Sequence, residues 1–242
     1  MEKKLERRLN FLTAYAVLST VAFGAILLTS FRGQDRTEAV DELTVKRINV
    51  VAEDGKLRMV ISNDYRQHSG RMNGKDMPKR ERPAGIIFFN TEGDECGGLV
   101  YRGEKVNGVV QSGMSFTMDQ YGYDQVIQIL NTEMMKDSTL MASRGFKIND
   151  LPLVTMEEVD NQFEAAKKIT DATARAGKLK ELRNKYGGTS RLFLGKAMDS
   201  NTGLFISDAS GKPKIKIYVD KDGTPKLEVL ASDGSFKNML GQ

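Results

Sequence analysis

The sequence predicts a mainly β protein: an N-terminal transmembrane helix, followed by an antiparallel β-meander body with one long helical insertion. Three observations lead to this prediction. Residues 11–31 contain no charged side chain. Further along, short runs that alternate apolar and polar residues recur between turns rich in Asp and Gly, which is the pattern of strands joined in hairpins. Residues 155–187 instead place apolar side chains every three or four positions, which is the period of a helix.

The uncharged run Phe11–Phe31 reads FLTAYAVLSTVAFGAILLTSF. A bilayer core of ~30 Å needs about 20 residues of helix, so this run can span a membrane. A cleaved signal peptide and a buried core helix are the alternatives. Signal-peptide cores have ~7–15 residues and end in a small-x-small cleavage site. Because this run is longer and ends in Thr-Ser-Phe, followed by Arg32, which is a poor cleavage site, we favour an anchor that is not cleaved.

The charges beside this run predict its orientation. Residues 1–10, the expected cytoplasmic tail, carry four bases just before the run, whereas the two bases of the linker 32–42 are diluted by four acids. Positive charge near a membrane helix favours the cytoplasmic side. We therefore expect the N-terminus inside and residues 43–242, the β-rich domain, outside the cytoplasm.

The domain repeats a unit of about 17 residues: an alternating run, an Asp/Asn-x-x-Gly or Asp-Gly turn, and a second run. Each unit is typical of a β-hairpin, since Asp-Gly supplies the positive φ that a tight turn needs. The prolines Pro213 and Pro225 fall where strands would start, where a missing N–H costs least. The copies are residues 48–62, 85–101, 113–130 and 203–219, with a partial copy at 226–236.

A single hairpin is marginal in water, so several must share a core. A sandwich, a small barrel, propeller blades and a solenoid sealed by symmetry-related chains all fit such repeats. We favour a sandwich or prism-like body, with oligomerisation covering the remaining edges. The lysine-rich runs KPKIKIYV and PKLEV are typical of edge strands that are charged against unwanted pairing.

Residues 64–84 form a basic stretch without periodicity, which predicts a long loop. Loops of this length without regular structure are usually functional or disordered. This one is either a solvated loop or a docking surface for an acidic partner or anionic lipid head groups. The candidate interaction residues are Arg66, Arg71, Lys75, Lys79, Arg80 and Arg82.

The helical insertion spans residues 155–187. A capping box, Thr155-x-x-Glu158, begins it and the pair Gly187–Gly188 ends it. Gly177 lies inside and could bend it or split it in two. Its apolar stripe either packs on the protein's own sheet or contacts a second copy or a partner. For the second alternative the candidate contact residues are Phe163 and Leu182.

Reactive side chains are scarce. The chain has one histidine (His68), one cysteine (Cys96) and no tryptophan. Neither sits in a nucleophile motif, and two such residues cannot build a usual zinc site. Acidic turns such as 220–223 leave weak calcium binding open, although the chain has no EF-hand loop. We therefore predict no catalytic, metal or cofactor residue and no enzymatic activity, while a carboxylate pair that meets across the fold stays possible.

The net charge of +4 and the isoelectric point near 9.0 could indicate nucleic-acid binding. Bases are concentrated, however, in the cytoplasmic flank and in residues 64–84. A domain outside the cytoplasm rarely meets nucleic acid, so we expect no such partner.

The anchor followed by LTVKRINVVAEDGKLRMVIS, GIIFFNTEGDECGGLVY and GLFISDASGKPKIKIYVDKDGTPKLEVL resembles a group of uncharacterised bacterial single-pass envelope proteins. The resemblance covers most of residues 40–240. It implies a place in the bacterial cytoplasmic membrane and no particular activity. We expect a non-enzymatic scaffold or accessory subunit that assembles with itself or with another membrane protein. A ligand-binding module, for cell-wall glycan or a similar ligand, is the alternative, and a hydrolase comes third.

Overall fold

The structure is a computed structural model that describes residues 2–30 and 39–240. The chain divides into two compact units, Met1–Thr44 and Val45–Gln242. Each unit has its own architecture.

The first unit contains helix α1 (Glu2–Ser30). Its segment Glu2–Leu27 is long and apolar enough to cross a membrane, and a signal sequence near an N-terminus has the same properties. The helix begins at Glu2, so residues 2–10 of the expected cytoplasmic tail are helical as well. Lys, Leu, Glu and Arg dominate that segment and are strong helix formers. Residues 31–38, which include the end of the predicted span and most of the predicted linker, lie outside the described residues.

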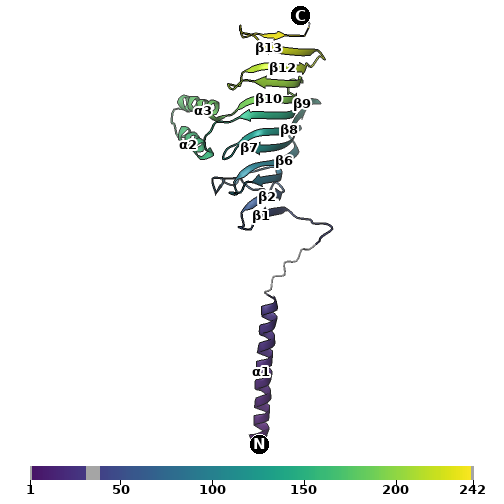
Figure 1. The fold of residues 1–242 in the computed structure, drawn as a ribbon, viewed down its shortest axis with the longest axis vertical. Helices are drawn as coiled ribbons and strands as arrows, with labels where there is room; N and C mark the ends of the chain where they lie inside the picture. Colours follow the sequence, from purple (N-terminus) through teal and green to yellow (C-terminus); the bar gives the residue numbers. More distant parts are fainter. Residues whose placement is uncertain (1, 31–38, 241–242) are drawn as a thin grey trace. The chain divides into compact units, whose positions relative to one another are not determined.

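The second unit is built on one antiparallel sheet of twelve strands that follow one another in chain order (Figure 1). The small ribbon of β3 and β4 stands apart from it. The strands are β1 (Arg47–Val51), β2 (Leu57–Ser62), β3 (Arg71–Met72), β4 (Lys75–Asp76), β5 (Ala84–Phe89), β6 (Glu95–Val106), β7 (Val109–Asp119), β8 (Gln125–Lys136), β9 (Thr139–Asp150), β10 (Thr189–Lys196), β11 (Thr202–Ser207), β12 (Pro213–Val219), β13 (Pro225–Leu230) and β14 (Phe236–Asn238).

This architecture confirms the predicted mainly β class and the antiparallel meander. The five predicted repeats are the hairpins β1–β2, β5–β6, β7–β8, β11–β12 and β13–β14. Gly223 has φ +85° in the turn between β12 and β13 and closes it with a bond from its N–H to the carbonyl of Asp220 (3.0 Å). Both predicted strand-start prolines begin strands, β12 and β13.

Two features of the meander do not follow from the repeat. Strands β9 and β10 lie outside the repeat copies, and they flank the helical insertion. The hairpins β6–β7 and β8–β9 turn on Asn107–Gly108 and Asp137–Ser138, where all four residues have positive φ. Two-residue turns of this kind match the right-handed twist of the strands they join.

The closure of the sheet differs from the prediction. The twelve strands form one sheet whose edges are β1 and β14, so the body is not a two-sheet sandwich or a closed prism. The lysine-rich runs are not edges either, because β12 and β13 are paired on both sides. Their lysines pair with acids: Lys214 with Asp208 at 3.0 Å, and Lys216 with Glu228 at 3.2 Å.

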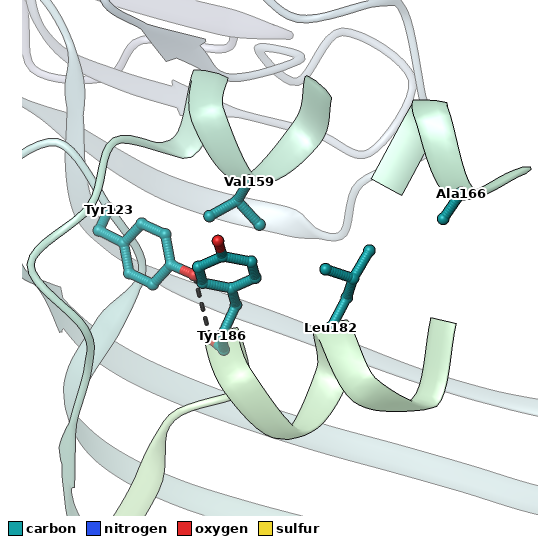
Figure 2. Packing of buried hydrophobic residues seen from close by; sticks show 5 residues of the cluster. All are labelled: Tyr123, Val159, Ala166, Leu182 and Tyr186. Carbon is teal, nitrogen blue, oxygen red and sulfur yellow. Dashed lines mark hydrogen bonds between the residues drawn. The ribbon is translucent and has the colours of Figure 1, made fainter. Parts of the chain in front are cut away.

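The helical insertion is a hairpin of α2 (Met156–Lys167) and α3 (Ala172–Tyr186). The chain breaks before Asp171, whose carboxylate caps α3 by accepting a 2.7 Å bond from the N–H of Ala174. Gly177 lies inside α3, so the predicted split there is wrong. An N-cap satisfies a free N–H of the new helix, whereas a glycine only weakens a helix. Figure 2 shows the core between the helices, whose buried residues are Tyr123, Val159, Ala166, Leu182 and Tyr186.

Residues 63–83 connect β2 to β5 and lie across one face of the sheet, which we call the loop face. The ring of His68 meets the ring of Phe89 edge-on at 4.9 Å, and Gln67 donates a 3.2 Å bond to the carbonyl of Gly85. Beneath them Val60 and Ile87 are almost completely buried. The N-terminal strands therefore have a core on the loop face.

Candidate interaction surface

The other face of the sheet carries a continuous row of apolar side chains. In an antiparallel sheet, directly opposed residues point to the same face. Following the register from strand to strand gives one apolar residue on each of eleven successive strands. This first row is Ile48, Ile61, Ile86, Leu99, Phe116, Ile129, Phe146, Leu194, Leu204, Ile217 and Leu227.

A second row runs beside the first, two residues away along every strand and therefore on the same face. It is apolar except for one glycine and for the lysine on the edge strand β14. This second row is Val50, Met59, Phe88, Gly97, Met118, Ile127, Ile148, Leu192, Ile206, Ile215, Val229 and Lys237.

The two rows together form what we call the apolar face. Its two rows are in contact with each other: the rings of Phe88 and Phe116 meet edge-on, with their centres 6.4 Å apart. None of its apolar side chains is buried, and seven of them are 37–54% exposed. These seven are Val50, Ile61, Met118, Ile129, Leu194, Ile217 and Val229.

The size of this surface is unusual for a single chain. Ten intervals of about 4.8 Å between strands give a length of about 48 Å, and two rows about 7 Å apart cover a width of about 14 Å. The resulting area, roughly 700 Å², exceeds the ~300–600 Å² of the largest apolar patch on a typical monomer. Apolar patches of this size usually mark an interaction site.

The loop face has a different composition. The same register places Thr117, Gln128 and Lys147 opposite one another there. Towards β14 the loop face carries ion pairs and aromatic rings, with Phe193 stacked on Phe205 at 6.1 Å. The loop face is thus covered by the strap or mixes polar groups with aromatic rings, whereas the other face is apolar and uncovered.

The basic residues predicted for residues 64–84 do not form one open surface. Arg82 is held in an ion pair with Glu95, and both side chains are only 15% exposed. The Arg71 guanidinium contacts Asp76 at 3.0 Å and the carbonyl of Gly74 at 2.8 Å.

The other four basic residues stay at the surface. Lys75 reaches Glu157 of α2 at 3.3 Å, and Arg80 donates a 3.0 Å bond to the carbonyl of Ser69. Lys79 lies 5.6 Å from the centre of the Tyr65 ring. The remaining candidate is Arg66, which is exposed. The sequence predicted a loop without regular structure here, and this prediction is wrong, since β3 and β4 lie within the segment. The segment is a folded strap across the sheet.

The two candidate contact residues of the helical insertion have different environments. Leu182 is completely buried between the helices (Figure 2), so it is part of the hairpin core and not of a surface. Phe163 is half-buried against the same core. The apolar side chains of the stripe pack between α2 and α3, because the chain folds back at residues 168–171.

An acidic group lies beside the Arg82–Glu95 pair. Burial raises the pKa of the Asp119 carboxyl to about 7, and the nearby charges of Glu95 and Asp124 act in the same direction. The Oδ1 atom of Asp119 is buried and has no hydrogen-bond partner in the described part of the chain. The surroundings of Asp119 therefore disfavour the charged form of its carboxyl.

The two reactive residue types have structural environments. Burial raises the pKa of the Cys96 thiol, which disfavours the nucleophilic thiolate. Burial lowers the pKa of His68, whose Nδ1 accepts a 3.1 Å bond from the N–H of Gly70. Among the described residues, no group of three or more His, Cys, Asp and Glu side chains is placed to hold a metal ion.

Comparison with known proteins adds no relative. No known protein family, curated protein or solved structure matches this chain. The function therefore has to be argued from the surfaces of the molecule itself.

The apolar face was not identified in the sequence. The alternation in each hairpin indicates one apolar face per strand, and this signal is visible in runs such as Ile215, Ile217 and Val219. What the alternation does not give is the register between strands. Only the register shows that the apolar positions of eleven strands join into one surface.

Proposed function

We propose that this chain is a membrane-anchored, non-enzymatic assembly subunit of the bacterial envelope. Helix α1 serves as an uncleaved anchor in the cytoplasmic membrane, with the N-terminus inside. The β body lies outside the cytoplasm and associates through its apolar face with a second apolar protein surface, either a copy of itself or another membrane protein.

One observation carries the proposal: the apolar face is uncovered along the whole sheet. A sheet normally buries its apolar face against another layer. Here the loop face has the strap of residues 63–83, whereas no described segment covers the apolar face. A chain that leaves about 700 Å² of apolar strip open to water is most stable when another protein covers it.

The anchor and the charges support the location. The segment Glu2–Leu27 meets the length and hydropathy of a membrane span. The four bases within residues 3–8 favour retention of this end in the cytoplasm. Two-dimensional confinement in a membrane also favours association, since it raises the effective concentration of anchored partners.

The test is the native mass of the full-length protein, extracted gently in detergent from its own membrane. We expect a defined complex larger than the 26.9 kDa chain. Intact-mass measurement of the same sample reports whether residues 1–30 are still present. A bare monomer would contradict the assembly role, and a chain that lacks its first helix would contradict the anchor.

A cleft favours ligand binding as the second candidate function. It has a volume of about 650 Å³ and opens between residues 64–65, residues 81–84 and residues 101–104. Tyr65 and Tyr101 line it and are exposed, as aromatic platforms for sugar rings are, and Arg102 and Glu104 add hydrogen-bonding groups. A thermal shift with cell-wall glycan fragments that Tyr65→Ala abolishes would support this function, and no shift would exclude those fragments as ligands.

A further inference from the structure

The apolar face restricts what can cover it. A partner must present a strip of matching length without charges, because an unpaired charge buried against hydrocarbon costs several kcal/mol. The two rows offer no hydrogen-bonding side chain for a polar ligand to use; their only charged member, Lys237, lies on the edge strand β14. Small polar molecules and nucleic acid are therefore poor occupants.

A second copy of this chain meets these requirements. Its apolar face has the same length, and when two such faces meet no charge other than the edge lysine is buried. The area of roughly 700 Å² per copy approaches the ~800 Å² per partner of a standard stable interface. Two sheets that pack in this way restore the two-layer arrangement that the single sheet lacks.

The folding of the body also favours a second copy. In the described part of the second unit, all buried hydrophobic residues except Ala142 of β9 belong to two clusters, one under the strap and one between the helices. Neither cluster lies beneath the apolar face. Strands β9 to β14 thus depend on an external layer for most of their burial, and a copy of the same chain is present whenever the chain is made.

We propose that the occupant of the apolar face is a second copy of this chain, packed face to face so that the two apolar faces overlap along their full length. This inference rests on the proposed function and names its partner. Full overlap leaves no apolar end exposed. It also brings Ile129, the sixth of the eleven residues in the first row, to the centre of the interface, next to Ile129 of the other copy.

The test uses adjacent residues on opposite faces of β8. Ile129 belongs to the apolar face, whereas Gln128 points to the loop face, opposite Thr117 and Lys147. Sheets packed face to face lie about 10 Å apart, which suits the photo-crosslinking side chain p-benzoyl-phenylalanine. It is placed at Ile129 or at Gln128 of the full-length chain, the cells are illuminated, and the products are identified by mass spectrometry.

We expect a product of twice the 26.9 kDa chain mass from position 129, at least tenfold more abundant than from position 128. A foreign polypeptide captured at position 129 would overturn the second-copy inference and leave the assembly role intact. Equal products from both positions would also overturn it. No intermolecular product from position 129, in a variant as protease-resistant as the natural chain, would overturn both proposals.

A second measurement needs no substitution in the β body. Two versions of the natural chain, with different C-terminal tags, are produced together and extracted in detergent. We expect each tag to recover the other, and no co-recovery when the two are extracted separately and then mixed. Failure of co-recovery from the joint preparation would contradict the second-copy inference even if the crosslinking variant did not fold.

Discussion

Arg82 and Glu95 form a two-pronged ion pair in which both guanidinium–carboxylate distances are 2.7 Å. Arg82 comes from the strap of residues 63–83 and Glu95 begins β6, so the pair fastens the strap to the sheet. The hydrogen bond to Glu95 is also the main cause of the raised pKa of Arg82. A parallel pair of charge-assisted bonds fixes geometry more tightly than a single contact does.

We expect Arg82→Ala to destabilise the body by about 2–4 kcal/mol, because it leaves the Glu95 carboxylate half-buried and unpaired. Urea unfolding of the full-length protein in detergent measures the change. Residues 63–83 should also become sensitive to protease before the sheet unfolds. Arg80→Ala is the matched control, since Arg80 donates one exposed bond to a carbonyl and its loss should cost about 1 kcal/mol or less. An equal effect of the two substitutions would contradict the fastening role.

Asp119 predicts how stability depends on pH. Its pKa is about 7 in the folded protein, against an ordinary value of 3.8. The folded state therefore binds a proton more tightly than the unfolded state. The free energy of unfolding that comes from this tighter proton binding is fully present below about pH 4 and is lost as the pH rises towards 7. The loss amounts to up to about 4 kcal/mol, at 1.36 kcal/mol per pH unit.

Asp119→Asn should remove this dependence. We expect the variant to be more stable than the natural chain at pH 8, with little difference near pH 4. Urea midpoints measured between pH 4 and pH 8 test this expectation. Glu53→Gln serves as the control, since Glu53 is exposed and is not among the charges that shift the pKa of Asp119. If the natural chain and Asp119→Asn give parallel pH profiles, the Asp119 carboxyl does not titrate in this range.

Leu182 tests the core of the helical insertion. It is fully buried between α2 and α3, so Leu182→Ala should destabilise the hairpin by about 2–4 kcal/mol through lost burial and the cavity left behind. We expect faster proteolysis at residues 168–171 and an unchanged native mass. Lys180→Ala, an exposed position of the same helix, should have no effect. A loss of assembly with an intact hairpin would instead assign Leu182 to an interface.

The position of Leu182 in the structure illustrates what the sequence could and could not predict. The helical period, both ends of the insertion and its apolar stripe were predicted correctly, because these are local features. The place where the stripe packs was not, since the fold-back at Asp171 depends on one cap among several polar residues.

The same limit applies to the sheet. Asp-Gly turns predict hairpins because positive φ is a local requirement, and Gly55 and Gly223 confirm it. The lysines of β12 and β13 suggested edge strands, whereas they pair with acids on neighbouring strands or turns. Pairing between distant segments, and hence the apolar face itself, depends on the register of the whole sheet.

Charge placed on the apolar face should disrupt assembly. Ile129→Lys removes a side chain whose burial contributes ~1.5–3 kcal/mol and adds a cation that has no partner there. We expect association to weaken by about 3 kcal/mol or more, which is at least about 100-fold, with the monomer appearing in native mass measurements. Gln128→Lys introduces the same charge on the loop face and should keep the natural mass. If both variants assemble normally, another surface holds the complex together.

The direction of packing can be predicted from the anchors. Parallel packing places the two β1 strands at the same end, so both linkers start together and both α1 helices reach one membrane. Antiparallel packing separates the β1 strands by about 48 Å, ten strand intervals.

Ile61 is second in the first row and Ile217 is tenth, so p-benzoyl-phenylalanine at Ile61 distinguishes the two arrangements. In the parallel arrangement the crosslink should map to residues 47–62 of the other copy. A crosslink to residues 213–219 would show antiparallel packing.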